Sequence, residues 1–386
     1  MSAESVTGQP PSVLRIAEKV DLRILLPAVA LTGIGLASLA STRPDLVGAQ
    51  LSGIVVGVAA ALTLVLLPYR TVLACAWPAW VFSVALLVFV LVAGPQVNGA
   101  RRWLRLGGVQ IQPSELAKVA QVLLLARYIR FRQDHRTFKG LFVPFALTLL
   151  PVLLIVKEPD LGSALLLVPS LFAMLWAAGA RVRHLCLVVA FGAASLPLVY
   201  RNLEPYQQRR VQTYLPVLTE KAAGSERPED RQRLSDARHQ VVRAEVAVAA
   251  GGLTGAGWQE GRMNLGNKVP EDWTDFIFVV HAEEWGFAGV VVLVLVYGLL
   301  FFSLVSVAQE CGEPAARLLC VGALVTLACQ TCVNLMMTIR LAPVTGVPLP
   351  FLSYGRSAML SAWLLVGLAM HAKAREPHVF TRSDFD

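Results

Sequence analysis

Ten apolar stretches, each near the length that crosses a bilayer, dominate this chain of 386 residues. A helix needs about 20 apolar residues to cross the hydrocarbon core. The stretches cover 22–41, 47–67, 72–93, 114–130, 140–157, 160–179, 183–200, 282–307, 316–338 and 357–373. Residues 290–296 are continuously apolar, whereas the strands of a membrane barrel alternate apolar and polar residues. We therefore predict an all-α integral membrane protein with about ten transmembrane helices and one large extracytoplasmic loop between helices 7 and 8.

The distribution of Lys and Arg among the short loops predicts the orientation, because positive residues collect on the cytoplasmic side. They gather between the fourth and fifth stretches, between the sixth and seventh, and after the tenth: Arg127, Arg130, Arg132, Arg136, Lys139, Arg181, Arg183, Lys373 and Arg375. Both termini are then cytoplasmic. The predicted organisation is an N-terminal tail over 1–21, a membrane domain over 22–373 that includes the outer loop 201–281, and a C-terminal tail over 374–386. We expect the first stretch to remain as an uncleaved span.

The net charge of +8 reflects this positive-inside bias, so it gives no ground for expecting nucleic-acid binding. The six cysteines lie in or beside apolar stretches. Cys329 and Cys332 have the spacing of a redox or metal pair, but no second pair accompanies them. We interpret the cysteines as packing residues.

Arg101 and Arg102 lie in a short outer loop, against the positive-inside rule, and this favours an anionic ligand there. Guanidinium groups have a geometry that suits phosphate. Trp103 fits either a sugar face or an anchor at headgroup depth. Contacts with anionic lipid headgroups are the alternative for the whole loop.

Glu115 and Lys118 lie three residues apart near the start of a span, so they share one face of the helix. Ionisable residues inside a span face a cavity or one another. The pair is therefore either self-neutralising or substrate-binding. Asp160 follows a Pro-containing turn and is expected near a helix N-terminus, where negative charge is favourable. Capping and substrate contact both fit Asp160.

Asp275 is the candidate for the reacting group of the polar segment that runs from about 201 to 275. We expect Thr274 to cap the next helix, which would place Asp275 in its first turn. A carboxylate held beside apolar side chains at the membrane boundary has the raised pKa that suits a general base. The helix dipole and arginine contacts oppose that shift, and a purely capping role is the alternative.

Three other patterns carry structural expectations. The glycine-rich run 251–257 has no βαβ unit around it, so we expect close backbone packing or a bend over the cavity mouth rather than nucleotide binding. Gln330 and Asn334 are expected to hydrogen-bond between helices. The segment 343–355 contains three prolines and is predicted to be a broken or re-entrant element that lines a cavity.

Five of these segments resemble, in order and spacing, the SEDS family of bacterial cell-wall polymerases. They are 98–104, 112–118, 158–163, 270–276 with 282–286, and 343–355, so the resemblance covers nearly the whole chain. It implies a peptidoglycan glycosyltransferase that polymerises lipid II on the outer face of the cytoplasmic membrane. It also implies a class B penicillin-binding protein as partner, together with other elongation or division proteins.

The resemblance implies that Asp275 is the essential acid of the outer loop. Its expected role is general base for a sugar 4-hydroxyl of one lipid II, which attacks the anomeric carbon of another. The family positions that line the central cavity correspond to Arg102, Trp103, Glu115, Lys118 and Asp160. Positive charge for the departing pyrophosphate is expected from Arg101, Arg102, Arg209, Arg210 or Lys118, and a divalent cation, Mg²⁺ or Mn²⁺, stays open as a cofactor.

The chain departs from the family pattern at three single positions and in one insertion. Trp273 replaces a histidine, Arg356 a glycine and Arg243 a glutamine, and a charged insertion occupies about 217–235. We expect altered loop packing with the chemistry retained.

Tyr206, Gln207, Arg210 and the modest N-terminal tail favour the elongation (RodA-like) type over the division (FtsW-like) type. Two other classes stay open, a lipid II transporter and a scaffold. A catalytic base predicts that Asp275→Asn abolishes function, whereas a scaffold predicts indifference to that change.

Overall fold

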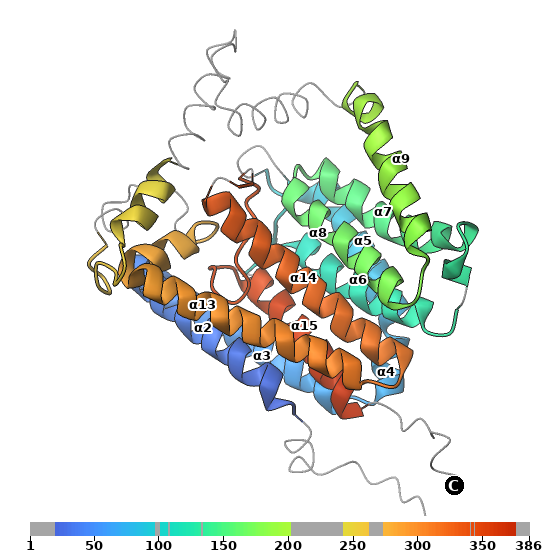
Figure 1. The fold of residues 1–386 in the computed structure, drawn as a ribbon, viewed down its shortest axis with the longest axis horizontal. Helices are drawn as coiled ribbons and strands as arrows, with labels where there is room; N and C mark the ends of the chain where they lie inside the picture. Colours follow the sequence, from blue (N-terminus) through green and yellow to red (C-terminus); the bar gives the residue numbers. More distant parts are fainter. Residues whose placement is uncertain are drawn as a thin grey trace, which may run out of the picture.

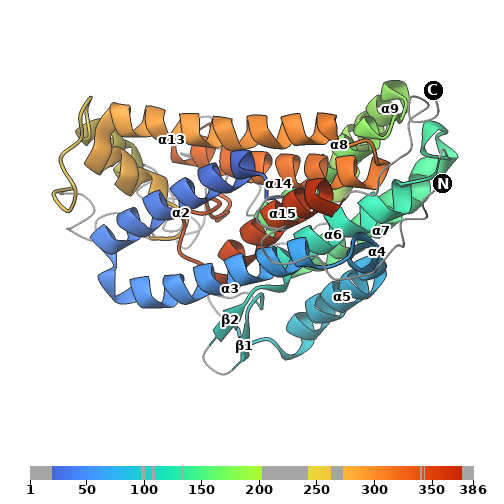
Figure 2. The same ribbon diagram turned by 90° about the horizontal axis from the view of Figure 1, so that it is seen from below.

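The computed structural model describes residues 20–96, 101–106, 109–132, 134–201, 242–261, 273–339, 341–342 and 344–375. This part of the chain is a helical bundle with one antiparallel two-stranded hairpin (Figures 1 and 2). The helices are α2 (Leu22–Thr42), α3 (Val47–Leu66), α4 (Tyr69–Ala74), α5 (Ala76–Ala93), α6 (Pro113–Ile129), α7 (Phe142–Lys157), α8 (Leu161–Ala177), α9 (Val182–Arg201), α13 (Ile277–Glu310), α14 (Pro314–Thr338) and α15 (Arg356–Arg375). The hairpin pairs β1 (Leu104–Leu106) with β2 (Val109–Ile111). Short 3₁₀ turns cover Pro44–Leu46, Asp134–Arg136 and Lys139–Leu141, and a further helix spans residues 242–250.

Every predicted apolar stretch coincides with helix in the structure. In the described part of the chain, seven helical segments are long and apolar enough to span a membrane. They are Leu22–Thr42, Pro44–Leu66, Ala76–Ala93, Lys139–Lys157, Ile277–Glu310, Pro314–Thr338 and Arg356–Arg375. Helices α6 and α8 each have 17 residues, and the apolar part of α9 is also short. The all-α membrane class is thus confirmed, while the count of ten spans stays a prediction.

Helix α15 forms the centre of the bundle, because 78% of its apolar window is buried, against 28% for α3. It packs on α3, α14 and α6. A Cβ on Gly367 would lie 2.7 Å from the Cα of Ala61, so a glycine is needed where α15 crosses α3. Small residues allow helix backbones to approach closely in membrane proteins.

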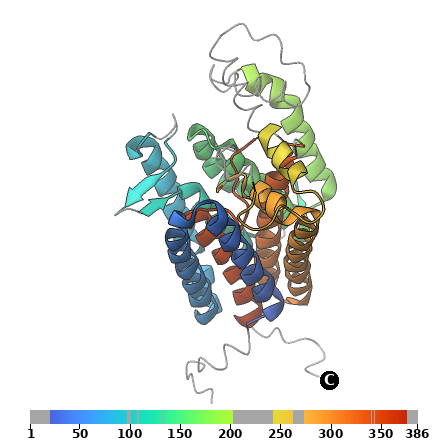
Figure 3. The same cartoon turned by 90° about the vertical axis from the view of Figure 1, so that its left-hand side faces the viewer.

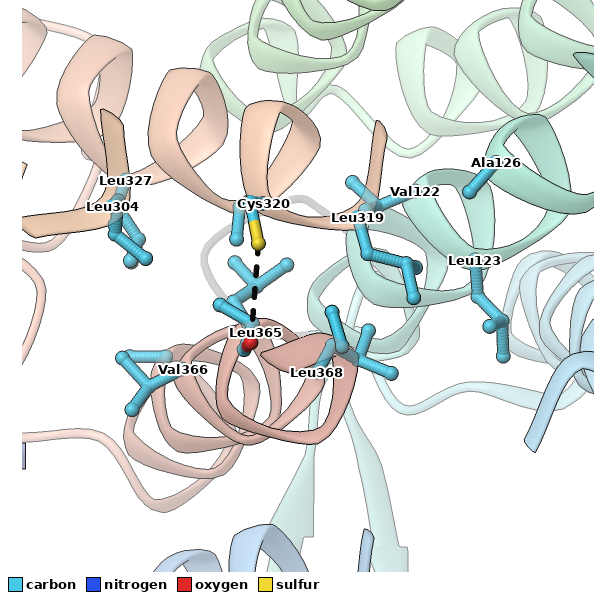
Figure 4. Packing of buried hydrophobic residues seen from close by; sticks show 14 of the residues in the cluster. Val122, Leu123, Ala126, Leu304, Leu319, Cys320, Leu327, Leu365, Val366 and Leu368 are labelled. Carbon is cyan, nitrogen blue, oxygen red and sulfur yellow. Dashed lines mark hydrogen bonds between the residues drawn. The ribbon is translucent and has the colours of Figure 1, made fainter. Parts of the chain in front are cut away.

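The apolar core fills the space between α6, α14 and α15 (Figure 4). Leu319 of α14 and Leu365 of α15 are both buried there, and the Sγ of Cys320 lies 3.8 Å from the carbonyl oxygen of Ala369. Large apolar side chains also cover the outside, including Phe82, Phe191 and Phe302. In an integral membrane protein this surface faces lipid, so its exposure needs no protein partner.

Helix α13 is kinked at Gly286, whose φ of 64° and ψ of −164° are non-helical. The glycine-rich run packs its backbone against the kink. The amides of Ala256 and Gly257 donate to Glu283 O and Glu284 O at 2.9 and 3.0 Å. A Cβ on Gly255 would lie 2.1 Å from Glu284 O, so the close backbone packing expected from the sequence is confirmed. Figure 3 shows this region (yellow) beside the start of α13 (orange). The loop therefore orients the first turns of α13, which follow Asp275 directly.

Candidate functional site

Asp275 lies in a turn over residues 273–276 whose backbone is held by three consecutive hydrogen bonds. Trp273 O accepts from the amide of Tyr354 at 2.9 Å, Thr274 O from Ser353 Oγ at 2.6 Å, and Asp275 O from Asn334 Nδ2 at 2.8 Å. The Asp275 side chain is half-buried. These three contacts hold the turn through its carbonyl oxygens.

The expectation that Thr274 caps the following helix is wrong. Helix α13 begins at Ile277, and its N-cap residue is Phe276, which makes no side-chain capping bond. The clamp on three successive carbonyls keeps residues 273–276 in a turn, which delays the start of the helix. Asp275 therefore precedes α13 instead of lying in its first turn.

The clamp is supplied by residues 344–355 and by α14. This segment has no helix or strand and is largely buried, as the re-entrant prediction requires. Asn334 Nδ2 also donates to Val347 O at 2.8 Å, and Gln330 Nε2 donates to Pro348 O at 2.9 Å. The interhelical hydrogen bonding expected of these two amides is confirmed for Gln330, whose Oε1 accepts from Lys118 of α6. The amide nitrogens of Gln330 and Asn334 also satisfy carbonyls of the irregular segment, because backbone groups buried away from water need partners.

Glu115 and Lys118 form a buried ion pair at the start of α6, with Lys118 Nζ 2.8 Å from Glu115 Oε1 and both side chains 1% exposed. Lys118 Nζ also donates to Gln330 Oε1 at 2.9 Å, and Ser361 Oγ donates to the second oxygen of Glu115. The pair thus joins α6 to α14 and α15. Gln330 and Asn334 are four residues apart, so the ion pair and the Asp275 turn meet α14 about one helical turn from each other.

Asp160 caps α8, since its Oδ1 accepts from the amide of Ser163 at 3.2 Å. Its Oδ2 accepts from Gln112 Nε2 at 2.9 Å and from Ser114 Oγ at 3.2 Å, which joins α8 to the start of α6. A Cβ on Gly162 would lie 2.8 Å from Thr345 O, so the first turn of α8 packs directly on the irregular segment. Residues 344–348 are therefore the meeting point of Asp275, the Asp160 turn and the Glu115–Lys118 pair.

The arginine-bearing loop leads into β1. Arg101 is exposed and donates to Val92 O at 3.3 Å, while Arg102 and Trp103 are half-buried. The Nε of Arg102 is buried without a hydrogen-bond partner among the described residues. Arg209 and Arg210, also expected at the site, lie outside the described residues, as does the charged insertion.

Glu158 is a site residue that sequence reasoning did not single out. It follows α7, its side chain is fully buried, and neither carboxylate oxygen has a hydrogen-bond partner in the part of the chain that the structure describes. Burial, with the neighbouring Asp160, raises the pKa of Glu158 to about 9, and the Arg102 guanidinium opposes the shift only in part. The signal in the sequence was a second acid two residues from Asp160, beside a proline turn.

We expect the Glu158→Gln variant to gain stability relative to the native chain as pH rises. The folded state keeps the Glu158 proton up to about pH 9, whereas an unfolded glutamate loses it near its ordinary pKa of 4.5. The native chain therefore loses stability between these two values, and glutamine, which is neutral, removes that loss. Thermal unfolding in detergent measures this effect. The free energy of unfolding of Glu158→Gln, relative to that of the native chain, should increase by about 1–3 kcal/mol between pH 5.5 and pH 8.5. The exposed Glu260→Gln serves as control; an equal growth there would contradict the assignment.

The three single departures from the family pattern have distinct surroundings. Trp273 lies under the guanidinium of Arg43, 4.7 Å from Cζ to the ring centroid, which is a cation–π contact. Arg356 begins α15 and packs on Gly53 of α3, where a Cβ would lie 3.0 Å from its Cγ. Arg243 is exposed on the helix over 242–250. The Arg43 contact shows how a tryptophan is accommodated at position 273.

Within the described residues, no group of three or more His, Cys, Asp or Glu side chains is arranged to hold a metal ion. A divalent cation, which the sequence leaves open as a cofactor, is not tested by this arrangement.

The fold and the site define a class: an all-α, multi-span membrane protein whose buried polar site is organised around an irregular segment at one end of the bundle. Comparison with known proteins identifies the family within this class. The family model for FtsW, RodA and SpoVE, described as "Cell cycle protein", matches residues 24–378. The chain therefore belongs to the FtsW/RodA/SpoVE family.

Individual relatives agree with this membership. The "Probable peptidoglycan glycosyltransferase FtsW" of Trichlorobacter lovleyi is 33% identical over 93% of this chain and 94% of its own length. The "Peptidoglycan glycosyltransferase MrdB" of Escherichia coli is 33% identical over 75% of each chain.

Solved structures share the fold. A structure titled "Structural coordination of polymerization and crosslinking by a peptidoglycan synthase complex" contains a chain with 33% identity and a TM-score of 0.76, covering 93% of this chain and 99% of that one. The rod shape determining protein RodA of Thermus thermophilus gives 29% identity and a TM-score of 0.69 over 93% of this chain and 98% of that one.

Proposed function

We propose that this protein is a peptidoglycan glycosyltransferase that polymerises lipid II on the outer face of the cytoplasmic membrane. The family membership supports the reaction class. The observation that carries the assignment of the site is the convergence on residues 344–348 of Asp275, the Asp160 turn and the Glu115–Lys118 pair. A polymerase needs a placed base and a charged environment for a departing pyrophosphate, and these residues supply both kinds of group.

In the proposed reaction Asp275 accepts the proton of the sugar 4-hydroxyl of one lipid II. The hydroxyl oxygen then forms a bond with the anomeric carbon of a second lipid II, and the bond from that carbon to the pyrophosphate oxygen breaks. The electron pair leaves with the lipid pyrophosphate. Arg101, Arg102 and Lys118, with Arg209 and Arg210 of the outer loop, are the candidates for stabilising that charge. Single displacement converts an α-linked donor into a β-linked polymer.

In this proposal both termini lie in the cytoplasm. A class B penicillin-binding protein forms a complex with this protein. The partner assignment is supported by the structural relative, whose title joins polymerization to crosslinking. Relatives named FtsW and MrdB match this chain at the same identity, so identity does not separate the division type from the elongation type. We infer an elongation role from Tyr206, Gln207 and Arg210. Restored rod shape in cells depleted of their elongation polymerase would support it, whereas rescue of division alone would reassign the protein.

The direct test is polymerisation of labelled lipid II by the purified protein with its cognate penicillin-binding protein, whose transpeptidase site is blocked. Glycan ladders establish a polymerase. A transporter instead moves labelled lipid II between the leaflets of a liposome without forming ladders, and a scaffold does neither. Assays with EDTA, Mg²⁺ and Mn²⁺ test the cation expectation in the same reaction.

We expect Gly346→Ala to reduce polymerisation by about 10–100-fold, because small displacements of reacting groups are costly. Gly346 has a φ of +70°, and an added Cβ would lie 3.2 Å from Asp275 Oδ2, so alanine both strains the segment and pushes the carboxylate. Initial rates of polymer formation measure the effect. Gly298→Ala is the matched control, since nothing lies within 4 Å of its added Cβ. Equal activity of the two variants would contradict the placement of Asp275.

A further inference from the structure

A second polar site lies at the opposite end of the bundle from Asp275. Helix α6 runs from Pro113, near the candidate site, to Ile129, and α14 runs from Pro314 to Thr338, so Ile129 and Pro314 mark the far end. The 17 residues of α6 span about 25 Å. A pocket of about 350 Å³ lies there, lined by Ile129, Arg130, Phe131, Arg132, His135, Arg136, Ala177, Ala178, Pro314, Arg317 and Leu318.

Four arginines from three parts of the chain line this pocket: Arg130, Arg132, Arg136 and Arg317. Among the described acids, Glu313 pairs with Arg130, but it also accepts from Tyr69 and caps α14 by accepting from the amide of Ala316 at 2.8 Å.

Asp134 lies 3.8 Å from Arg132, with both side chains more than half exposed. A solvent-exposed pair of this kind contributes little binding energy. Arg317 Nη2 donates to Cys311 O at 3.1 Å. The lining thus carries more positive than negative charge.

His135 gives the pocket a buried polar wall. The residue is 5% exposed, and its Nε2 lies 2.9 Å from Ala178 O, which fixes the ring. The carbonyl requires the proton on Nε2. The other nitrogen, Nδ1, is buried and has no hydrogen-bond partner among the described residues.

We propose that this pocket binds a phosphate group, and that the phosphate belongs to an anionic phospholipid headgroup at the cytoplasmic surface. Guanidinium forks match phosphate oxygens in two-point hydrogen bonds. Basic pockets between transmembrane helices on the cytoplasmic side suit such headgroups. The positive-inside rule alone accounts for arginines in these loops. It does not account for their convergence on a concave pocket that also contains a buried ring with an unpartnered nitrogen.

The test uses the full-length protein in detergent and native mass spectrometry. Phosphatidylglycerol, phosphatidylcholine and inorganic phosphate are added separately. We expect phosphatidylglycerol to bind in preference to phosphatidylcholine, and Arg136→Gln with Arg317→Gln to weaken that binding about tenfold or more. The control, Arg181→Gln with Arg183→Gln, removes two exposed charges at the start of α9, outside the pocket lining, and should retain native binding. Since Arg132 is also exposed, Arg132→Gln alone should weaken binding a few-fold without unfolding the protein.

Binding of inorganic phosphate with the same sensitivity to the pocket variants supports the phosphate site and identifies a soluble source. Equal weakening by the pocket and control variants would overturn the proposal. So would a native protein that binds neither phosphatidylglycerol in preference to phosphatidylcholine nor inorganic phosphate.

Discussion

The Asp275→Asn variant is expected to polymerise lipid II about 10²–10⁴ times more slowly than the native protein. Asparagine has nearly the shape of aspartate but cannot accept the proton of the attacking hydroxyl. The loss should appear in the rate of glycan ladder formation with the cognate penicillin-binding protein present. Stability should be retained, because Asn334, Ser353 and Tyr354 hold the turn through its carbonyl oxygens.

Asp134→Asn is the matched control for this prediction, since its carboxylate is exposed at the other end of the bundle. It makes the same chemical change and should leave the ladders unaltered. Native ladders from Asp275→Asn would refute the role of Asp275 as base. If Asp275→Asn also had a melting temperature low enough to unfold it under the assay conditions, the loss of activity would be assigned to folding.

The second large effect is expected from Lys118→Met, which should lower the free energy of unfolding by about 3–5 kcal/mol. Methionine has a similar volume but leaves the carboxylate of Glu115 buried without its cation. Among the described residues, Ser361 then remains as a hydrogen-bond donor to that carboxylate. Thermal and denaturant unfolding of the purified membrane protein in detergent measure the loss.

The double variant Glu115→Leu with Lys118→Met should recover most of that stability, because replacing a whole buried ion pair by apolar residues is often neutral or stabilising. A double-mutant cycle gives the coupling between the two residues. Additive losses would show that the pair is not coupled. Activity of the stable double variant then separates the two interpretations of the pair: an inactive, folded protein indicates substrate binding, and an active one indicates a structural role.

The sequence predicted the helices well, because a membrane span depends on a local property, the run of apolar residues. All ten stretches became helix, although the span predicted over 282–307 begins earlier, at Ile277. The kink of this helix at Gly286 is in contact with the glycine-rich loop, which precedes it in the sequence. A hydropathy window contains no information about such a contact.

The sequence predicted which residues belong to the candidate site better than it predicted their hydrogen-bond partners. Asp160 and the Glu115–Lys118 pair stood out because charge near a span is rare. Their links to Gln112, Gln330 and Ser361 could not be derived, since they join helices whose relative rotation only the packed bundle determines. Arg43 was missed for the same reason. Its position over Trp273 depends on how the turn between α2 and α3 meets a segment 230 residues further on.

The clamp on the 273–276 turn also bears on how this protein and its relatives can diverge. Trp273 and Thr274 contribute their carbonyl oxygens to it, and every residue type has a carbonyl. Mutation at these two positions can therefore exchange the side chain without removing these carbonyl contacts. Asn334 and Ser353 donate from their side chains, so most substitutions at these two positions would remove the hydrogen bond. The tolerance for change around this acid should lie in its immediate neighbours along the chain, and the constraint should lie some 60 to 80 residues away.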